Sequence, residues 1–463
     1  MSKLARRQAP ALRPAGLIVA GFILVIMVGA LLLTLPMSSA DGTGTGLVTA
    51  LFTATSATCV TGLIVVDTAT HWSTFGEIVI LALIQIGGLG VMSLAALLGL
   101  LVMRRVGLRT QMAARAETKS VEFGDGRRVI LRVIGTSLVV EAVIAAVLTV
   151  RFAVGYGQGL VHSAYLGVFH AISAFNNAGF ALYSDNLVGF VGDPWIILPI
   201  SAGLVIGGIG FPVIFELRRA FRRVRGRAAH PDRKTPARPW FSLHVRMTLI
   251  VYGALAVIGV VVLTASEWRN PGTLGPLGFS DKLLAGLFSG LSPRTAGFNS
   301  IDVAAMHPSS LLVTDVLMFI GGGSAGTAGG IKVTTFAILG YVILSEIRGE
   351  PTVHAMRRRI SPEVQRQAVT VALLGVGAVM LVALALMYLT DFRLDAILIE
   401  TVSAFATVGL STGITPSIPA AGQLLLAALM LLGRLGPITL ASALALRERV
   451  RRFERPEERP IVG

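Results

Sequence analysis

Cysteine is almost absent from this chain, and charged residues are scarce. The single cysteine among 463 residues, Cys59, excludes an internal disulfide. Only 14% of the residues are charged, whereas 54% are hydrophobic, and the mean hydropathy is +0.75. A chain that folds in water does not have this composition. The sequence therefore predicts a polytopic membrane protein.

Clustered acids and histidines are also missing from the apolar segments. The seven histidines are scattered singly, whereas a membrane enzyme needs His, Asp or Glu gathered at one depth. We therefore expect no enzymatic activity. No A-x-A-like cleavage site and mature domain follow the first apolar segment, which indicates a retained anchor rather than a signal peptide.

The net charge of +15 suggests nucleic acid as a partner, but basic loops beside apolar segments are what membrane insertion requires. We therefore expect no nucleic-acid partner. The same loops would attract the headgroups of anionic membrane lipids.

Eight apolar segments are long enough, or nearly so, to cross roughly 30 Å of hydrocarbon as helices. They lie near residues 15–35, 74–103, 129–152, 195–215, 245–264, 311–344, 368–389 and 424–446. Lysine and arginine gather before the first segment and after the second, fourth, sixth and eighth. Because cytoplasmic flanks hold the basic excess, both termini are predicted to be cytoplasmic.

One short motif occurs four times in the chain. The copies are SATCVTGLIVVD (56–67), SAFNNAGFALYSD (173–185), GLSPRTAGFNSID (290–302) and SAFATVGLSTG (403–413). Their central glycines are Gly62, Gly179, Gly297 and Gly409, about 115 residues apart, a period far too long for a solenoid repeat. Each copy therefore belongs to a whole subdomain.

Each subdomain reads as an apolar segment, a short apolar segment, the glycine motif and a second apolar segment. Two crossings per unit make all four units enter the membrane in the same direction, so an axis along the membrane normal relates them. The predicted fold is an all-α polytopic membrane protein with four tandem M1-P-M2 repeats (helix, re-entrant pore loop, helix), arranged pseudo-fourfold around a central pore. The expected divisions are a cytoplasmic tail (1–14), repeat 1 (15–105), a basic loop with repeat 2 (106–225), a loop with repeat 3 (226–350), a loop with repeat 4 (351–446) and a second cytoplasmic tail (447–463).

The short segments 47–61, 163–178, 281–296 and 395–408 are candidates for re-entrant helices because they are too short to cross the membrane. Asp281 and Asp395 could act as N-caps of two of them. Each helix would point its partly negative carboxyl end toward the pore, where a cation is favoured. Glycine follows because carbonyl groups turned toward one axis need dihedral angles that a Cβ opposes.

A second glycine-rich landmark follows each motif: IGGLG (86–90), IGGIG (206–210), IGGGSAG (320–326) and LGRLG (432–436). For the first two copies, close helix packing is the favoured explanation. The third copy extends to residue 330, and its six glycines predict a broken helix that lines a cavity. It lacks the Gly-Lys-Ser/Thr of a nucleotide-binding loop.

In the fourth copy Arg434 replaces a glycine. A guanidinium inside the bilayer costs at least about 2.5 kcal/mol unless it faces water or partners. It could form a buried pair that holds two helices together. We favour a pore-facing charge that bonds to carbonyls freed by the break at 321–330 and repels cations when the path is shut.

These motifs resemble the Trk/Ktr/HKT superfamily of potassium transporters over essentially the whole chain. The first apolar segment leads directly into the first pore loop with no extra hairpin ahead of it, so the chain is most similar to the Ktr membrane (pore) subunit. The resemblance implies potassium uptake across the plasma (inner) membrane through a four-loop selectivity filter. A sodium-coupled secondary potassium symporter, or a less selective monovalent cation channel, is the alternative.

The resemblance also assigns site residues, with potassium bound at filter backbone carbonyls. The filter residues are Thr58, Cys59, Val60, Thr61, Gly62, Asn176, Asn177, Ala178, Gly179, Arg294, Thr295, Ala296, Gly297, Ala406, Thr407, Val408 and Gly409. The gate residues are Gly321, Gly322, Gly323, Ser324, Gly326, Thr327, Gly329, Gly330, Lys332 and Arg434. In this family a serine at the first filter glycine is associated with sodium permeation, so Gly62 favours potassium.

The family further implies a homodimer resting on a cytoplasmic ring of regulatory subunits. Nucleotide is expected on that ring and not on this chain, which carries no covalently bound cofactor.

Several other side chains have two possible roles. Arg294 would repel potassium if it pointed inward, and we expect it to brace the pore loop from behind. Glu141 is either a functional charge or, as we favour, one with a buried partner in the bundle. Glu400 and His170 are expected to hydrogen-bond the filter scaffold. Three acids, Asp67, Asp185 and Asp302, either raise the cation concentration at the mouth or cap turns.

Overall fold

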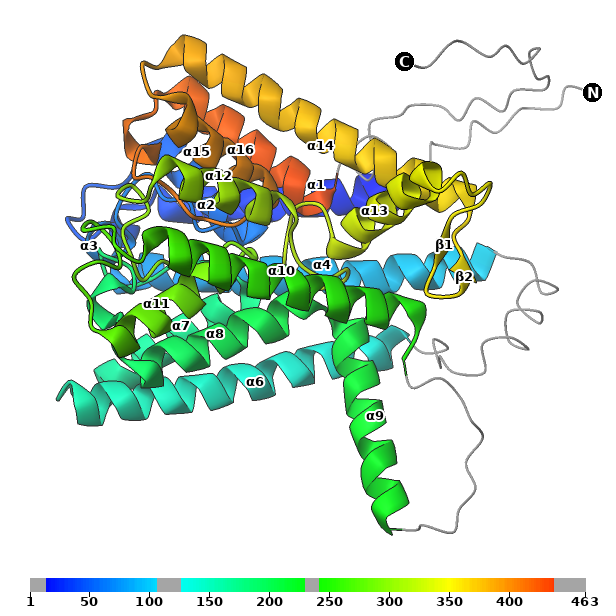
Figure 1. Cartoon of the computed structure of the whole chain (residues 1–463). Coiled ribbons are helices and arrows are strands. Elements are labelled where there is room, and N and C mark those ends of the chain that lie inside the picture. Colours follow the sequence, from blue (N-terminus) through cyan, green and yellow to red (C-terminus); the bar gives the residue numbers. More distant parts are fainter. Residues whose placement is uncertain (1–13, 106–125, 230–240, 437–463) are drawn as a thin grey trace, which may run out of the picture.

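The computed structural model describes residues 14–105, 126–229 and 241–436. These residues form a bundle whose long helices run side by side along one axis, with short helices packed between them (Figure 1). The tails predicted at 1–14 and 447–463 lie almost wholly outside the described residues, as does most of the basic loop that begins at 106.

The helices follow the chain in four successive groups. The first holds α1 (Pro14–Leu33), α2 (Leu47–Cys59), α3 (Thr68–His71) and α4 (Thr74–Arg105), and the second holds α6 (Gly126–Gly155), α7 (Leu160–Asn176), α8 (Pro194–Ile209) and α9 (Phe211–Ala229). The third holds α10 (Leu243–Glu267), α11 (Phe279–Leu291), α12 (Pro308–Phe319) and α13 (Val333–Ile347), and the fourth α14 (Pro362–Leu389), α15 (Leu394–Ala406) and α16 (Ala420–Leu435). Short 3-10 turns occur at Pro36–Ser38, Val188–Phe190 and Thr415–Ser417, and the strands β1 (His354–Ala355) and β2 (Arg358–Arg359) form a small antiparallel hairpin.

Three described helices are long and apolar enough to cross a membrane, namely Val129–Gly155, Leu243–Glu267 and Pro362–Leu389. A fourth crossing is formed if α8 and α9 count as one element, although they are bent by 102°. Two other predicted crossings are covered by α1, with 20 residues, and by α4, with 32 residues. The last predicted crossing begins in α16 and continues beyond the described residues. The apolar segment predicted at 311–344 holds two helices, α12 and α13, which are separate at the place where the glycines of 321–330 predicted a break.

The outer surface of the bundle is apolar. On α14, Leu373 and Leu381 are about two-thirds exposed, at 67% and 66%. On α6, Val139 and Val143 are similarly exposed. Continuous apolar surface of this kind needs an apolar solvent, so the bundle is a membrane protein whose long helices face lipid.

The short helices α2, α7, α11 and α15 occupy the four segments predicted to be re-entrant. The prediction that Asp281 and Asp395 are N-caps is wrong. Gly278 and Arg393 occupy the N-cap positions of α11 and α15, so both aspartates fall in the first turn. A carboxylate there still interacts favourably with the positive end of the helix dipole.

Candidate functional site

The four glycine motifs have the same backbone form. In each copy the residue two positions before the glycine has a left-handed conformation: Val60 (φ 57°), Asn177 (61°), Thr295 (73°) and Thr407 (48°). The glycines themselves have φ values of 91°, 72°, 73° and 97° in chain order. Positive φ is strained for residues with a Cβ. The four segments therefore share one backbone conformation, with a positive φ at the glycine and at the residue two positions before it.

The four glycines lie against one another. A Cβ built on Gly179 would lie 2.7 Å from Cα of Gly297, and one on Gly62 would lie 3.2 Å from Cα of Gly179. On Gly409 it would lie 3.0 Å from Cα of Gly62 and 3.1 Å from Cα of Gly297. The contacts close into a ring, in which a side chain on any of the glycines would overlap its neighbour.

Side chains around this ring are buried, and several of their oxygens have no hydrogen-bond partner. The residues from the four motifs that were assigned to the filter are almost fully enclosed. Asn177 Nδ2 donates to Thr295 Oγ1 at 3.2 Å, but Asn177 Oδ1 is unpartnered. The other unpartnered oxygens are Thr58 Oγ1, Thr61 Oγ1, Asn176 Oδ1 and Thr407 Oγ1. These oxygens are acceptors that lie beside the ring of glycines.

Serines hold the loops in place, and the sequence reasoning did not single them out. The amides of Gly62 and Gly409 donate to Ser56 Oγ at 3.1 Å and to Ser403 Oγ at 2.9 Å. Ser173 Oγ donates to the Phe180 carbonyl at 2.7 Å, and Ser292 Oγ donates to that of Phe298. The signal was present, because a serine stands five or six residues before each glycine.

The helices that follow the motifs pack their landmark glycines on the short helices. A Cβ on Gly87 would overlap the Thr58 carbonyl oxygen, one on Gly207 that of Phe175, and one on Gly433 that of Phe405. Close helix packing is thus found in the first two copies, where it was predicted, and also in the fourth. In the third copy, Gly321 instead faces the Gly329 carbonyl of its own loop.

The third landmark is a non-helical segment between α12 and α13, as its glycines predicted. We call residues 320–332 the glycine-rich loop. Its amides bind carbonyls freed at the end of α8: Gly323 N donates to Gly208 O at 2.8 Å and Thr327 N to Gly207 O at 3.2 Å. In return the Phe211 amide of α9 donates to the Ala325 carbonyl at 3.2 Å. The loop is therefore docked on the bend between α8 and α9.

Arg434 joins this loop to two helices. Its Nη1 donates to the Thr327 carbonyl and its Nη2 to the Gly87 carbonyl of α4, the latter at 3.0 Å. The ion pairs found within residues 14–105, 126–229 and 241–436 join other residues, such as Arg151 with Asp193. Lys332 Nζ likewise donates to the Ala328 and Gly329 carbonyls, at 2.5 and 3.3 Å. The geometry therefore agrees with a cation bonded to freed carbonyls rather than with a buried ion pair.

Arg294 is buried beside the third motif and reaches the start of the same loop. Its Nη2 donates to the Ile320 carbonyl at 3.3 Å, and its guanidinium lies 5.4 Å from the centre of the Tyr252 ring. These contacts fit the expected brace and also connect the third motif to the glycine-rich loop.

Glu141 has buried partners, as we favoured. Its carboxylate accepts from Gln85 Nε2 at 3.1 and 3.2 Å and from Asn176 Nδ2 at 3.3 Å. Asn176 Nδ2 also donates to the Gln85 side-chain oxygen at 2.8 Å. The network ties α4 and α6 to the end of α7.

Glu400 and His170 support the segments that leave the motifs. Glu400 accepts from the Thr412 amide at 3.1 Å and from Thr415 Oγ1 at 2.7 Å. His170 Nε2 accepts from the Leu182 amide at 3.3 Å, and its other ring nitrogen lies 2.8 Å from the Leu166 carbonyl. Both side chains brace the scaffold, as predicted.

The three acids after the motifs act as turn caps. Asp67 Oδ1 accepts from the Ala69 amide, Asp185 Oδ2 from that of Gly189 and Asp302 Oδ1 from that of Ala304, each at 2.9 Å. Capping is therefore present in all three, and the attraction of cations to the mouth stays a prediction.

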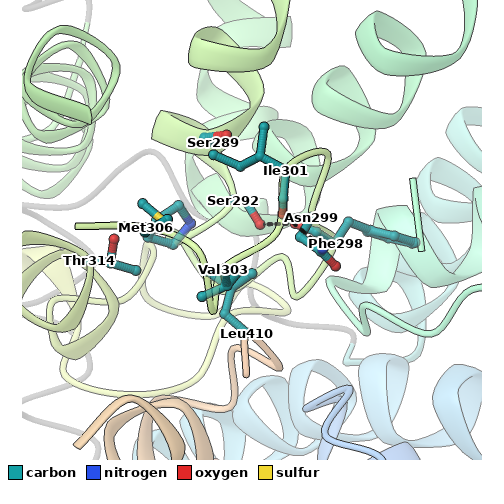
Figure 2. A pocket seen from close by; sticks show the side chains of 10 residues that line it. Ser289, Ser292, Phe298, Asn299, Ile301, Val303, Met306, Thr314 and Leu410 are labelled. Carbon is teal, nitrogen blue, oxygen red and sulfur yellow. Dashed lines mark hydrogen bonds between the residues drawn. The ribbon is translucent and has the colours of Figure 1, made fainter. Parts of the chain in front are cut away.

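A small cavity lies beside the third motif. Figure 2 shows Ser292, Asn299 and Thr314 around it, with Leu410 of the fourth motif on another wall. Its volume of about 20 Å³ is room for one water molecule. The cavity is too small for an organic substrate.

Comparison with known proteins shows the family to which the chain belongs. Residues 6–449 match the TrkH family model, described as cation transport protein. The chain is 39% identical to Ktr system potassium uptake protein B of Bacillus subtilis (94% of each chain covered). It is 36% identical to the Vibrio alginolyticus protein of that name (96% of this chain, 94% of that one). Potassium/sodium uptake protein NtpJ of Enterococcus hirae is 32% identical over the full length of both.

A crystal structure of the potassium transporter TrkH from Vibrio parahaemolyticus has the same fold. It superposes with a TM-score of 0.73 at 17% identity, covering 96% of this chain and 87% of that one. The resemblance found in the sequence is confirmed, as is the expectation that the protein is a transporter and not an enzyme. The chain belongs to the TrkH family of cation transport proteins.

Proposed function

We propose that this protein takes up potassium across the plasma membrane through a selectivity filter formed by the four glycine motifs. The observation that carries the proposal is the ring of Gly62, Gly179, Gly297 and Gly409, whose segments share one left-handed backbone form. Carbonyl groups turned toward a common axis can replace the hydration shell of potassium. The names of the Bacillus subtilis and Vibrio alginolyticus relatives point to the same ion.

The proposed architecture has four M1-P-M2 repeats around the pore, with the divisions expected from the sequence. The short helices α2, α7, α11 and α15 aim their carboxyl ends at the filter, where half a negative charge each favours a cation. Potassium moves inward down the membrane potential, worth about 2.3 kcal/mol per charge for each 100 mV. No bond chemistry is required of the protein.

The glycine-rich loop and Arg434 form the proposed gate below the filter. The loop is held by backbone hydrogen bonds to Gly207 and Gly208 and by the guanidinium bond to Thr327. Opening would break these bonds and move the arginine charge, which repels cations while it lies near the path.

The assembly is proposed to be a homodimer on a cytoplasmic ring that binds nucleotide. Both termini and the basic loops face the ring and the inner leaflet in this arrangement. The word "system" in the names of two relatives fits a membrane subunit that works with another protein.

The test is cation flux into proteoliposomes that hold the purified chain, with potassium, rubidium and sodium compared at one fixed diffusion potential. We expect saturable uptake of potassium and rubidium and little uptake of sodium. Equal flux of all three ions would show that the four glycines form no selective filter.

A sodium-linked function is the second candidate, because the Enterococcus hirae relative is named a potassium/sodium uptake protein. If sodium couples to transport, an inward sodium gradient drives potassium against its own gradient in the same vesicles. A less selective channel instead dissipates both gradients.

A further inference from the structure

Helix α9 leaves the bundle sideways. It follows α8 at a bend of 102° and projects away from the other helices, toward the end that carries α13 and the β hairpin (Figure 1). The long apolar helices run along the bundle axis, and helices that span a bilayer lie close to its normal. A helix that crosses this axis near the basic, cytoplasmic end runs along the plane of the membrane.

Two exposed stripes of α9 differ in chemistry. Arg218, Arg222 and Arg225 recur at helical spacing and are exposed. Leu217 and Phe221, one turn apart, form an apolar stripe beside these arginines and are also exposed, at 38% and 67%. An exposed stripe of Leu and Phe flanked by arginines is typical of a helix that lies in the membrane interface, because the long arginine side chains reach the headgroups.

The acidic residue of α9 bonds to the bundle. Glu216 accepts from the Ser242 amide at 2.9 Å, and Ser242 in turn caps α10. The carboxylate therefore fixes the base of α9 to the bundle, and the arginine face complements negatively charged headgroups.

The bend that aims α9 is also the place where the glycine-rich loop docks. Gly210 has a φ of 95°, and a Cβ there would lie 2.5 Å from the Ser324 carbonyl oxygen of the loop. The next residue, Phe211, begins α9 and donates its amide to the Ala325 carbonyl. A change in the direction of α9 must therefore move groups that hold the loop.

We propose that α9 is a sensor of anionic lipid: headgroups of the inner leaflet hold it in the membrane plane and so stabilise the docked glycine-rich loop. The effect on transport rests on the proposed gate, whereas binding to the membrane does not. We favour lipid over a soluble partner because the bend of 102° directs α9 along the membrane plane. Its exposed Phe221 and arginines then lie at the surface of the bilayer.

The first experiment places a nitroxide on Phe221→Cys in the full chain, since Cys59 is buried and does not compete. In vesicles with phosphatidylglycerol we expect the label to be protected from an aqueous relaxation agent and accessible to oxygen. Raising the salt concentration from 0.1 to 1 M, which shortens the Debye length from about 10 to about 3 Å, should reduce this protection.

Two triple variants test whether the effect of anionic lipid depends on the arginines of α9 in particular. R218Q/R222Q/R225Q should lose the lipid dependence of the label, and R357Q/R358Q/R359Q, which removes three exposed arginines from the β hairpin, should keep it. A label that is equally accessible to the aqueous relaxation agent in anionic and zwitterionic vesicles would overturn the proposal. So would spin–spin broadening from a second α9, or burial of the label only when a soluble protein is added.

Potassium flux tests the link to the gate in the same vesicles. Added phosphatidylglycerol should lower flux severalfold in the wild type and in the hairpin variant, but not in the α9 variant. Lipid-independent flux in all three would overturn the coupling. If no variant conducts, the proposed function fails while the label still decides whether α9 binds the membrane.

Discussion

At the scale of the residue, Gly62 combines two reasons for being glycine. Its φ of 91° is unfavourable for other residues, and any Cβ would overlap the Ala178 carbonyl oxygen. The carbonyls of the first and second motifs therefore keep their places only if position 62 has no side chain. The resemblance to the family adds that serine here accompanies sodium permeation.

We predict that Gly62→Ser lowers the ratio of potassium to sodium flux by roughly tenfold, since a loss of about 1.4 kcal/mol in discrimination has that effect. The measurement is the flux ratio in proteoliposomes. Gly42→Ser is the matched control, because Gly42 also has a positive φ (71°) but open space around it. Unchanged selectivity in Gly62→Ser would remove this glycine from the filter.

The contacts of Glu141 favour a structural role for its carboxylate over a role in binding the ion. It receives hydrogen bonds from Gln85 and Asn176, so removing the carboxylate leaves the Gln85 donor without a partner, whereas Asn176 Nδ2 keeps its bond to the Gln85 oxygen. Glu141→Ala should therefore destabilise the protein by about 1–3 kcal/mol, visible as an earlier loss of the intact particle on heating in detergent. Glu141→Gln should lose less.

Glu363→Gln, an exposed position on α14, is the control for the Glu141 variants. If Glu141 variants were as stable as this control but bound potassium more weakly, the side chain would act on the ion and not on the scaffold.

At the scale of the element, the glycine-rich loop is held by α8 and by Arg434, and its own Lys332 braces it from within. Each hydrogen bond from a charged group contributes about 1.5–3 kcal/mol. Arg434→Ala should therefore shift a two-state gate toward the open form and raise flux roughly tenfold or more, with selectivity unchanged. Deleting the loop should act in the same direction.

Arg393→Ala is the control for Arg434→Ala, because it removes a guanidinium from an exposed ion pair with Asp395. Flux equal to wild type in both Arg434→Ala and the loop deletion would refute the gate. A fall in selectivity would instead place Arg434 at the filter.

The elements also show which features the sequence could predict. The short helices and the broken third landmark follow from local signals, namely apolar length and glycine content. The N-caps of α11 and α15 do not follow from local signals, because the first residue of a helix also depends on the path of the chain that enters it. Gly278 and Arg393 occupy these positions, and they precede the aspartates that were predicted as caps. The docking of the loop on Gly207 and Gly208 joins segments that are far apart in the sequence, and no local pattern encodes it.

At the scale of the whole molecule, orientation is the property on which uptake depends. The loop between α1 and α2 and the β hairpin lie toward opposite ends of the bundle (Figure 1). The hairpin carries Arg357, Arg358 and Arg359, whereas Asp41 lies in the other loop. From the distribution of basic residues we predict that the hairpin lies in the cytoplasm and the α1–α2 loop outside.

We predict that a membrane-impermeant maleimide labels Thr43→Cys in intact cells, whereas it labels Arg358→Cys only after permeabilisation. Wild type should stay unlabelled in both conditions because its only cysteine, Cys59, is buried. The reverse labelling pattern would show that the protein has the opposite orientation in the membrane. The α1–α2 loop would then be cytoplasmic, α9 would lie at the outer leaflet, and the proposed inward path, cytoplasmic ring and lipid sensor would all have to be abandoned together.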